Sequence, residues 1–522
     1  AVRAAGGRWQ VKTEGSLVDV DPVLWWPGEE GPAGAAWRQG PHRLTAGWQL
    51  DVQLPADAAR LPPLQLAQRV AGIGTVRLHE SLVAGVPVQG ELTLGYRSGG
   101  SAPGQLRAEL RAAGSRLVVD GRGDPLGPGL QDRYHGDLSV DSLAALAPLL
   151  KLAPEAADWA GADARAAVTL DAEGRWPDVR SHGSATAQQL QAQGTTLARA
   201  RFDWRFDTGA DQPLAGTLDV SGLRSGGWTM DTLKAELQGT ARAHRLTLDA
   251  ELPLRPPAWT EDLLGLRPGP GTRARLRGQG AWLADGAGGG SWRGVVDELL
   301  VGASGEAARR ASALPGEWLE ARGLRTELRF VPAGGLRELR AEAGQARIAR
   351  ELQLRWDAIR VDLGGARPDF EIRAQVDPFQ AAPMLARMQP TMGWGGDLLL
   401  KARLNIAAAA QRFSADVAFE RDRGDLSIDD PSGRQALGLQ SLQLALTADD
   451  GRWKLVEQLS GRILGDIRGE QQLRTAPGQR WPDARTPLTG RVEARVGNLG
   501  IWSAWVPAGW RLGGSLVTQA TI

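Results

Sequence analysis

Arg201-Phe202-Asp203-Trp204-Arg205-Phe206-Asp207 alternates charged and aromatic side chains at every position. Successive side chains of a β-strand point to opposite faces, so this stretch predicts a strand with one apolar and one charged face. The same alternation recurs at 324–330, 351–357, 370–376 and 442–446. Turn residues such as Gly99-Gly100 and Asp450-Gly451 separate these segments at short intervals. Many short strands of one-sided polarity predict an all-β protein of antiparallel hairpins and not βαβ units.

Helical signals are few in this sequence. The stretch 141–152 carries leucines at helical spacing, and Asp141 is placed to cap its first turn. The stretch 380–388 is the second candidate. We therefore expect a few short helices within a protein made mostly of strands.

These two candidate helices belong to an internal repeat. Val20, Val140, Val376 and Val496 each precede a short helical segment, and they are separated by 120, 236 and 120 positions. A Pro/Trp corner and a run of strands follow, with the corners at Pro154 and Trp159, Pro390 and Trp394, and Pro507 and Trp510, and a degenerate copy at Pro257 and Trp259. The sequence therefore predicts a unit of about 120 residues, the alternative being chance similarity in a chain rich in Ala, Gly and Leu.

The repeat predicts five segments along the chain. They are 1–139, with strands; 140–251, beginning with the helix at 141–152; 252–375, degenerate; 376–495, beginning with the helix at 380–388; and 496–522, the start of a further unit. A chain of such units forms an elongated sheet in which each unit contacts only its neighbours. Its apolar face must fold over, pair with another sheet or hold a nonpolar ligand.

Composition limits the classes of function. The 522 residues contain 61 Lys+Arg against 60 Asp+Glu, which argues against a nucleic-acid partner because such proteins carry a concentrated positive excess. The chain has no cysteine, which suits an oxidising compartment. No stretch reaches the roughly 18–20 apolar residues that a bilayer span requires. The chain begins and ends within expected strands, so we expect it to be part of a longer protein.

Residues with the spacing of a catalytic or metal site are not found. His42, His79, His135, His182 and His244 are scattered, without the pairing that a zinc site uses. The sequence has no nucleophile elbow, P-loop or dinucleotide-binding glycine pattern. We therefore expect no enzyme activity, no cofactor and no metal.

Tryptophan is over-represented, with 20 Trp against 7 Phe and 2 Tyr. The corner residues Trp159, Trp394 and Trp510 are expected to plug the ends of the repeat units. Strand tryptophans such as Trp204, Trp282 and Trp356 either line a surface for an apolar guest or pack in a core. One alternation pattern predicts both arrangements, so this choice stays open.

With the repeat in view, the chain resembles the TamB translocation and assembly module family of diderm bacteria, in the AsmA-like superfamily. The segments that carry the resemblance are 140–150, 166–178 and 252–259. It implies an antiparallel sheet curled into an open, U-shaped (taco-like) groove, similar to bridge-like lipid transfer proteins. It also implies a periplasmic chain whose parent is anchored in the inner membrane by an N-terminal helix, with a TamA-like outer-membrane barrel as partner.

The resemblance leads to two functional hypotheses. In the first, the apolar groove holds phospholipid acyl chains and carries phospholipid between the inner and outer membranes, supporting outer-membrane biogenesis. In the second, the same face is a scaffold for unfolded outer-membrane β-barrel proteins, including autotransporters. A third hypothesis, a secreted β-solenoid adhesin, fits less well because such chains are rich in Asn, Thr and Ser with short rungs.

The residues expected to line the groove are apolar strand residues flanked by polar ones. They are Phe202, Trp204, Phe206, Leu276, Leu328, Phe330, Leu352, Leu354, Trp356, Phe370, Ile372, Leu400, Leu404, Leu442, Leu444 and Leu446.

Overall fold

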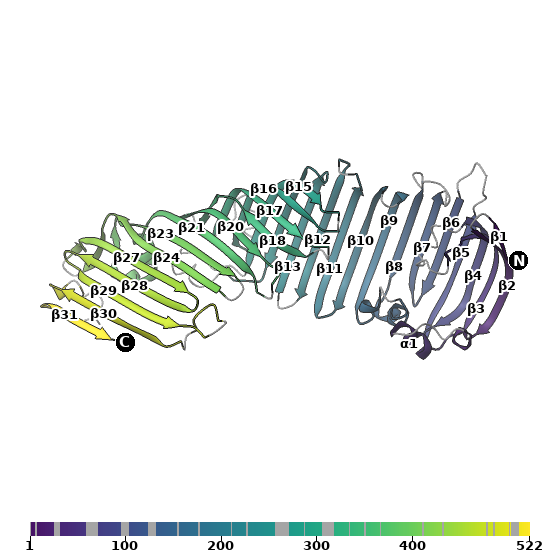
Figure 1. Ribbon diagram of the computed structural model, residues 1–522, viewed down its shortest axis with the longest axis horizontal. Coiled ribbons are helices and arrows are strands. Elements are labelled where there is room, and N and C mark those ends of the chain that lie inside the picture. The colour runs from purple at the N-terminus through teal and green to yellow at the C-terminus, as the bar shows by residue number, and fades with distance from the viewer. Residues whose placement is uncertain are drawn as a thin grey trace. The chain divides into compact units, whose positions relative to one another are not determined.

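The computed structural model contains two compact units, residues 1–244 (unit 1) and 245–522 (unit 2). The structure describes residues 2–5, 8–25, 32–58, 71–95, 104–123, 132–153, 156–175, 178–209, 211–225, 228–255, 271–286, 288–304, 318–332, 335–348, 351–365, 367–409, 412–430, 433–476, 479–483, 486–500, 502 and 511–521. Strands dominate both units, as the alternation predicts (Figure 1).

Unit 1 is an antiparallel meander in which each strand pairs with the next strand of the chain. Its strands are β1 (Val2–Ala5), β2 (Arg8–Val20), β3 (Leu44–Pro55), β4 (Ala71–Val83), β5 (Val86–Gly95), β6 (Gly104–Ala112), β7 (Ser115–Gly123), β8 (Arg133–Val140), β9 (Asp163–Arg175), β10 (Asp178–Ala192), β11 (Thr195–Asp207), β12 (Leu214–Ser225) and β13 (Trp228–Gly239). All twelve neighbouring pairs are antiparallel. Strand β14 (His244–Leu252) begins at the last residue of this unit.

Unit 2 continues the same pairing scheme with one broken strand. Its main sheet contains β15 (Thr272–Ala284), β16 (Gly290–Ala303), β17 (Leu319–Phe330), β18 (Leu336–Ala341), β19 (Gly344–Ile348), β20 (Leu352–Asp362), β21 (Asp369–Gln380), β23 (Leu399–Ala409), β24 (Arg412–Arg423), β27 (Leu439–Asp449), β28 (Arg452–Gly461), β29 (Gly465–Arg474), β30 (Leu488–Val496) and β31 (Leu516–Thr521). Strands β18 and β19 together fill one strand position between β17 and β20. A separate small sheet contains β22 (Gly395–Gly396), β25 (Leu426–Asp430) and β26 (Gly433–Ala436).

The all-β fold class is therefore confirmed, and the described strands are not closed into a barrel. The described helices are short: η1 (Pro22–Leu24), α1 (Pro32–Gln39), η3 (Ala144–Leu146), α3 (Ala147–Leu150), η4 (Ala157–Trp159), α6 (Ala382–Met388) and η5 (Pro390–Met392), where η denotes a 3₁₀ helix. None of them has the length and apolar character that a bilayer span requires.

The helix expected at 141–152 is shorter than predicted and differently capped. It is divided into the 3₁₀ turn η3 and the single α turn α3, because Pro148 lacks the amide hydrogen that a continuous helix needs. Asp141 does not cap it. Instead, the Ala144 amide donates to Asp163 Oδ1 and the Ala145 amide donates to Ser142 Oγ, at 3.4 and 3.3 Å.

The four anchor valines occupy equivalent places in the sheets. Val20, Val140 and Val496 each end a strand, and Val376 lies shortly before the end of β21. Each pairs with a residue at or near the start of the next main-sheet strand: Val20 with Leu44, Val140 with Ala166, Val376 with Ala402 and Val496 with Leu516. Five strands lie between the first anchor strand and the second, β2 and β8, and five main-sheet strands lie between the third and the fourth, β21 and β30. Since neighbouring strands alternate in direction, the two anchor strands of each unit run the same way, and the anchor valines of that unit lie toward the same rim of its sheet. The boundaries of the 120-residue units, and the corners at Pro154, Pro257, Trp259, Pro507 and Trp510, which lie outside the described residues, stay predictions.

Compact apolar clusters lie near the rims of the sheets, and a further one surrounds Trp356 in the middle of β20 in unit 2. In unit 1, Leu146 and Leu149 of the η3–α3 connection pack against the buried Val86 and Val88. In unit 2, α6 and the small sheet pack around the buried Leu398 and Ile428, with Trp394 against them. A second cluster of unit 2, around Phe413 and Trp453, lies near the ends of the same strands away from α6. The other described corner tryptophan, Trp159, is half-exposed.

Three strand tryptophans lie flat over glycines of the neighbouring strand. The pairs are Gly15 with Trp48, Gly183 with Trp204 and Gly344 with Trp356. A Cβ atom built on these glycines would lie 2.5, 2.6 and 2.7 Å from the indole ring. Each indole N–H also finds an acceptor: Thr13 Oγ1 for Trp48, Ser181 Oγ for Trp204 and the Glu342 carbonyl for Trp356. Because glycine has no side chain, the indole ring can lie directly on the backbone of the neighbouring strand.

Gly15→Ala is expected to destabilise the β2–β3 pair by about 1–3 kcal/mol, because the new methyl group overlaps the Trp48 ring. Gly47, next to Trp48, is a matched control with no atom within 4 Å of a built Cβ. Gly47→Ala should be neutral or stabilise by about 0.5 kcal/mol, because the unfolded chain loses freedom. Hydrogen exchange of β2 and β3 measures both changes, and equal effects of the two substitutions would contradict the tight packing of Trp48 on Gly15.

Candidate functional site

The antiparallel register aligns apolar side chains from strand to strand on one face of unit 1. One row runs Leu110, Leu117, Leu138, Val168, Ala185, Phe202, Leu218 and Ala235, each residue paired directly with the next. A parallel row includes Trp48, Val76, Leu92, Ala108 and Val119. We call this surface the apolar face of unit 1.

Large side chains of this face remain substantially exposed. Phe202 is 43% exposed, and Leu92 and Leu110 are each 41% exposed. Phe202 stacks on Trp204, with ring centroids 5.5 Å apart, so the two aromatic rings form a continuous apolar patch on β11. Contiguous exposed apolar surface marks a binding surface for a nonpolar partner.

Unit 2 has an equivalent face. One row runs Leu404, Val417, Leu446 and Leu455, and Phe419 pairs with Leu444 beside it. Phe419 and Leu444 are 39% and 42% exposed, although Phe413, on the same strand as Phe419, is buried in the rim cluster. We call this surface the apolar face of unit 2.

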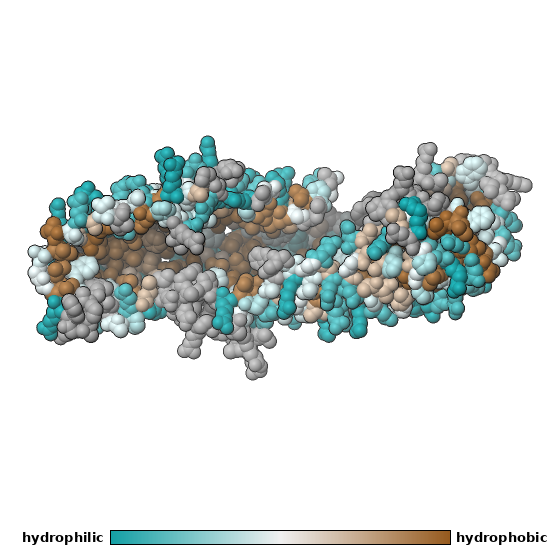
Figure 2. All heavy atoms as spheres, turned by 90° about the horizontal axis from the view of Figure 1, so that it is seen from below, coloured by the Kyte–Doolittle hydropathy of each residue, from teal (hydrophilic) through white to brown (hydrophobic). Residues whose placement is uncertain are grey.

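Figure 2 shows the left part of the molecule, where the last strands lie, as a hollow with brown side chains along it and teal side chains at its margins. The brown colour marks hydrophobic residues and the teal colour hydrophilic ones. On β24 and β27, the half-exposed Phe419 and Leu444 lie between the closed clusters around Leu398 and around Phe413, so the apolar channel of unit 2 is open at these strands.

The expected groove residues fall on these two faces. Phe202, Trp204 and Phe206 lie on β11 in unit 1; Leu276 lies on β15, Leu328 and Phe330 on β17, Leu352, Leu354 and Trp356 on β20, Phe370 and Ile372 on β21, Leu400 and Leu404 on β23, and Leu442, Leu444 and Leu446 on β27 in unit 2. They differ in exposure. Trp356 is buried over Gly344, whereas Phe202 and Leu444 are exposed.

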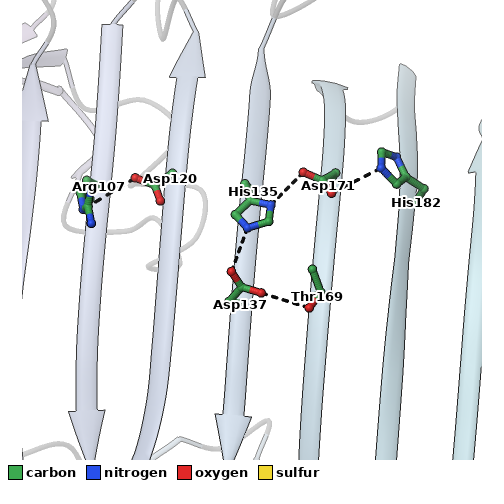
Figure 3. A network of polar contacts seen from close by, with 7 residues as sticks. All are labelled: Arg107, Asp120, His135, Asp137, Thr169, Asp171 and His182. Carbon is green, nitrogen blue, oxygen red and sulfur yellow. Dashed lines mark hydrogen bonds and ion pairs between the residues drawn. The ribbon is translucent and has the colours of Figure 1, made fainter.

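The opposite face of unit 1 carries polar contacts between neighbouring strands (Figure 3). Arg107 on β6 pairs with Asp120 on β7, and a separate network links β8, β9 and β10. The imidazole of His135 lies between two carboxylates, with Nδ1 2.8 Å from Asp171 Oδ1 and Nε2 2.8 Å from Asp137 Oδ2. His182 approaches the second oxygen of Asp171 at 3.4 Å. Sequence reasoning treated the histidines as scattered, and only the strand register brings His135 and His182 to the two sides of Asp171.

The hydrogen bonds to Asp171 and Asp137 raise the pKa of His135, and the bond from His135 lowers the pKa of Asp137. Both side chains are well exposed, so solvent screens the interaction. Among the described residues, no group of His, Asp and Glu is arranged to hold a metal ion. The network therefore acts as a ladder of charge-assisted bonds that links neighbouring strands.

His135→Gln is expected to remove a pH-dependent part of the stability of unit 1. Because the pKa of His135 is raised in the folded state, its stabilisation is complete below the unfolded pKa of about 6.5 and is lost as the pH rises through the folded value. Hydrogen exchange of β8 and β9 at pH 5.5 and pH 8.5 should show a larger difference between wild type and variant at pH 5.5. An equal difference at both values would contradict the ion-paired imidazolium.

The polar face of unit 2 carries a depression of about 860 Å³ beside the broken strand. Five arginines line it, and each is paired with a carboxylate: Arg293 with Glu327, Arg325 with Glu342, Arg340 and Arg360 with Glu338, and Arg373 with Glu371. All five arginines are therefore already ion-paired, and the depression is a poor site for an anion.

The apolar faces are thus the surfaces best suited to a ligand. No protein-family profile, curated protein or solved structure matches this chain.

Proposed function

We propose that this chain is a lipid-binding sheet that carries phospholipid across the periplasm between the inner and outer membranes. The observation that carries the proposal is the half-exposed Leu and Phe side chains on the apolar face of each unit, such as Phe202 in unit 1 and Phe419 and Leu444 in unit 2. Each CH₂ group of an acyl chain placed on such a surface contributes about 0.8 kcal/mol. Transfer along the face requires no covalent chemistry.

The fold supports this proposal because antiparallel pairing repeats one arrangement of side chains from strand to strand. An acyl chain that lies along the row from Leu110 to Ala235 meets apolar atoms at every step. The charged side chains of the same strands point to the other face, where they pair with one another, as Arg201 does with Asp203. A lipid headgroup would remain in solvent beside the apolar face.

The location and the partner are part of the same proposal. The absence of cysteine suits an oxidising compartment such as the periplasm. The resemblance to the TamB family supports a parent protein anchored in the inner membrane and a TamA-like barrel in the outer membrane as partner.

Mass spectrometry of gently extracted protein tests the proposal. We expect phospholipid to copurify with the chain and to be released by organic solvent. Protein free of lipid, or protein that carries unfolded outer-membrane β-barrel polypeptides in place of lipid, would contradict the proposal; the second result would favour a scaffold for barrel insertion.

A further inference from the structure

A pair of polar side chains interrupts the apolar face of unit 2. Glu457 on β28 pairs with Gly469 and Leu444, and Gln471 on β29 pairs with Leu455 and Gly490. Along β28 and β29 the same face carries Trp453, Leu455, Leu459, Ile467 and Leu473. A carboxylate and an amide at these positions interrupt an otherwise apolar pattern. They indicate a site for a polar group of a ligand on this face.

The geometry leaves one acceptor of this pair unsatisfied. Gln471 is only 8% exposed, and its Nε2 donates to Glu457 Oε2 at 3.3 Å. Its Oε1 is buried and has no hydrogen-bond partner. Turning the amide round would place its oxygen against the carboxylate, so Oε1 must be the free atom. An unsatisfied buried acceptor costs about 1–3 kcal/mol, which a donating ligand would recover.

Glycines on the neighbouring strands leave room for both side chains to lie close to the sheet. A Cβ built on Gly469 would lie 2.6 Å from Glu457 Oε2, and one built on Gly490 would lie 2.9 Å from Gln471 Cγ. This repeats the arrangement of the tryptophans over their glycines, with polar groups in place of indoles. The carboxylate and the amide therefore lie close to the sheet within the apolar face. The amide oxygen is buried there, so a guest reaches it only when the Gln471 side chain moves.

The two groups select a ligand that donates hydrogen bonds and is positively charged. A primary ammonium has three N–H donors and one positive charge, and it matches a carboxylate and an amide oxygen. The exposed Leu444 pairs directly with Glu457, so an apolar chain attached to the ammonium finds a surface there. This neighbour favours an amphiphile over a free amine or a lysine side chain.

We propose that Glu457 and Gln471 form a binding site for the primary ammonium group of an amphiphile, such as an aminophospholipid. The site rests on the proposed function, because the attached chain uses the same apolar face. It adds selectivity for one headgroup class to a surface that binds acyl chains by their apolar atoms alone. A quaternary ammonium carries the same charge but has no N–H donor, and it should be discriminated against.

Calorimetric titration of the whole chain with decylammonium and with decyltrimethylammonium tests the site. We expect wild type to bind decylammonium roughly tenfold more tightly, because hydrogen bonds to a charged group are the strong ones. Glu457→Gln should reduce the ratio of affinities to about one and Gln471→Leu to about three, if the carboxylate contributes most of the difference. Glu470→Gln is the matched control, since Glu470 lies on the opposite face and pairs with Lys454, and it should leave the ratio unchanged.

The failures of the site and of the proposed function are separable. Equal affinity for the two probes, no binding of either, or a preference that survives Glu457→Gln would overturn the site and leave Gln471 bonded to water alone. If acetyl-lysine amide competes for the site as strongly as decylammonium does, the ligand is a lysine side chain of a protein and not an amphiphile, which would overturn the proposal. Lipid-free protein that still prefers decylammonium would overturn the proposed function and retain the site, and lipid-loaded protein without the preference would do the reverse.

Discussion

Phe202→Glu is expected to reduce phospholipid crosslinking from a probe at its cross-strand neighbour, Leu218, by about tenfold or more. A carboxylate placed against acyl chains costs well over the roughly 1.4 kcal/mol that corresponds to a tenfold change in affinity. Phe202 is exposed, so the sheet should still form, with a loss of about 1 kcal/mol from its contact with Trp204. A photoreactive residue at position 218 measures the lipid contact, and circular dichroism measures the fold.

Gln188→Glu is the control for this substitution. It adds the same carboxylate to the polar face of the neighbouring strand, where Gln188 lies between Arg165 and Arg199. Crosslinking to phospholipid should be unchanged. A loss of the fold in Phe202→Glu would show that Phe202 belongs to a closed core, and equal crosslinking in both variants would show that lipid does not occupy this face.

Phe413→Ala is expected to destabilise unit 2 by about 3–5 kcal/mol, because a fully buried aromatic side chain is removed from a packed cluster. The ring of Phe413 contacts two tryptophans, with centroid distances of 5.5 Å to Trp453 and 4.8 Å to Trp481. Hydrogen exchange of peptides from β23 and β24 measures the local free energy of opening without assuming that the whole chain unfolds in one step.

Phe419→Ala is the matched comparison, on the same strand and the same face. Phe419 is 39% exposed, so its removal should cost no more than about 1–1.5 kcal/mol. A larger loss of stability in Phe413→Ala than in Phe419→Ala would show that the apolar face is closed at the rim and open in the middle of the strand. Equal large losses would mean that the apolar face is sealed along its whole width, as in a compact β-sandwich.

The sequence was sufficient to predict the strands and the faces of the sheet. The alternation at Phe202, Trp204 and Phe206 requires a strand with one apolar face, and the structure has that strand in β11. The same reasoning identified β20, β21 and β27 from their leucines and aromatic residues. These predictions succeed because the two-residue period of a strand is a local property.

Features that depend on register could not be predicted from the sequence. The position of His135 opposite Asp171 and the place of Gly183 beneath Trp204 follow from which residues of neighbouring strands face each other. Bulges, such as the one at Trp356–Ala358, shift that register without a clear sequence signal. Glu457 and Gln471 were missed for the same reason, since only the sheet shows that they interrupt an apolar row.

The most direct test of the central claim is a photocrosslinking scan along β11 from position 199 to position 206. We expect phospholipid adducts at Ala200, Phe202, Trp204 and Phe206, whose side chains share the apolar face, and none at the intervening positions. Adducts with this two-residue period would place acyl chains on one face of the sheet. Lipid adducts that ignore the period, or adducts to polypeptide alone at the four apolar positions, would contradict it.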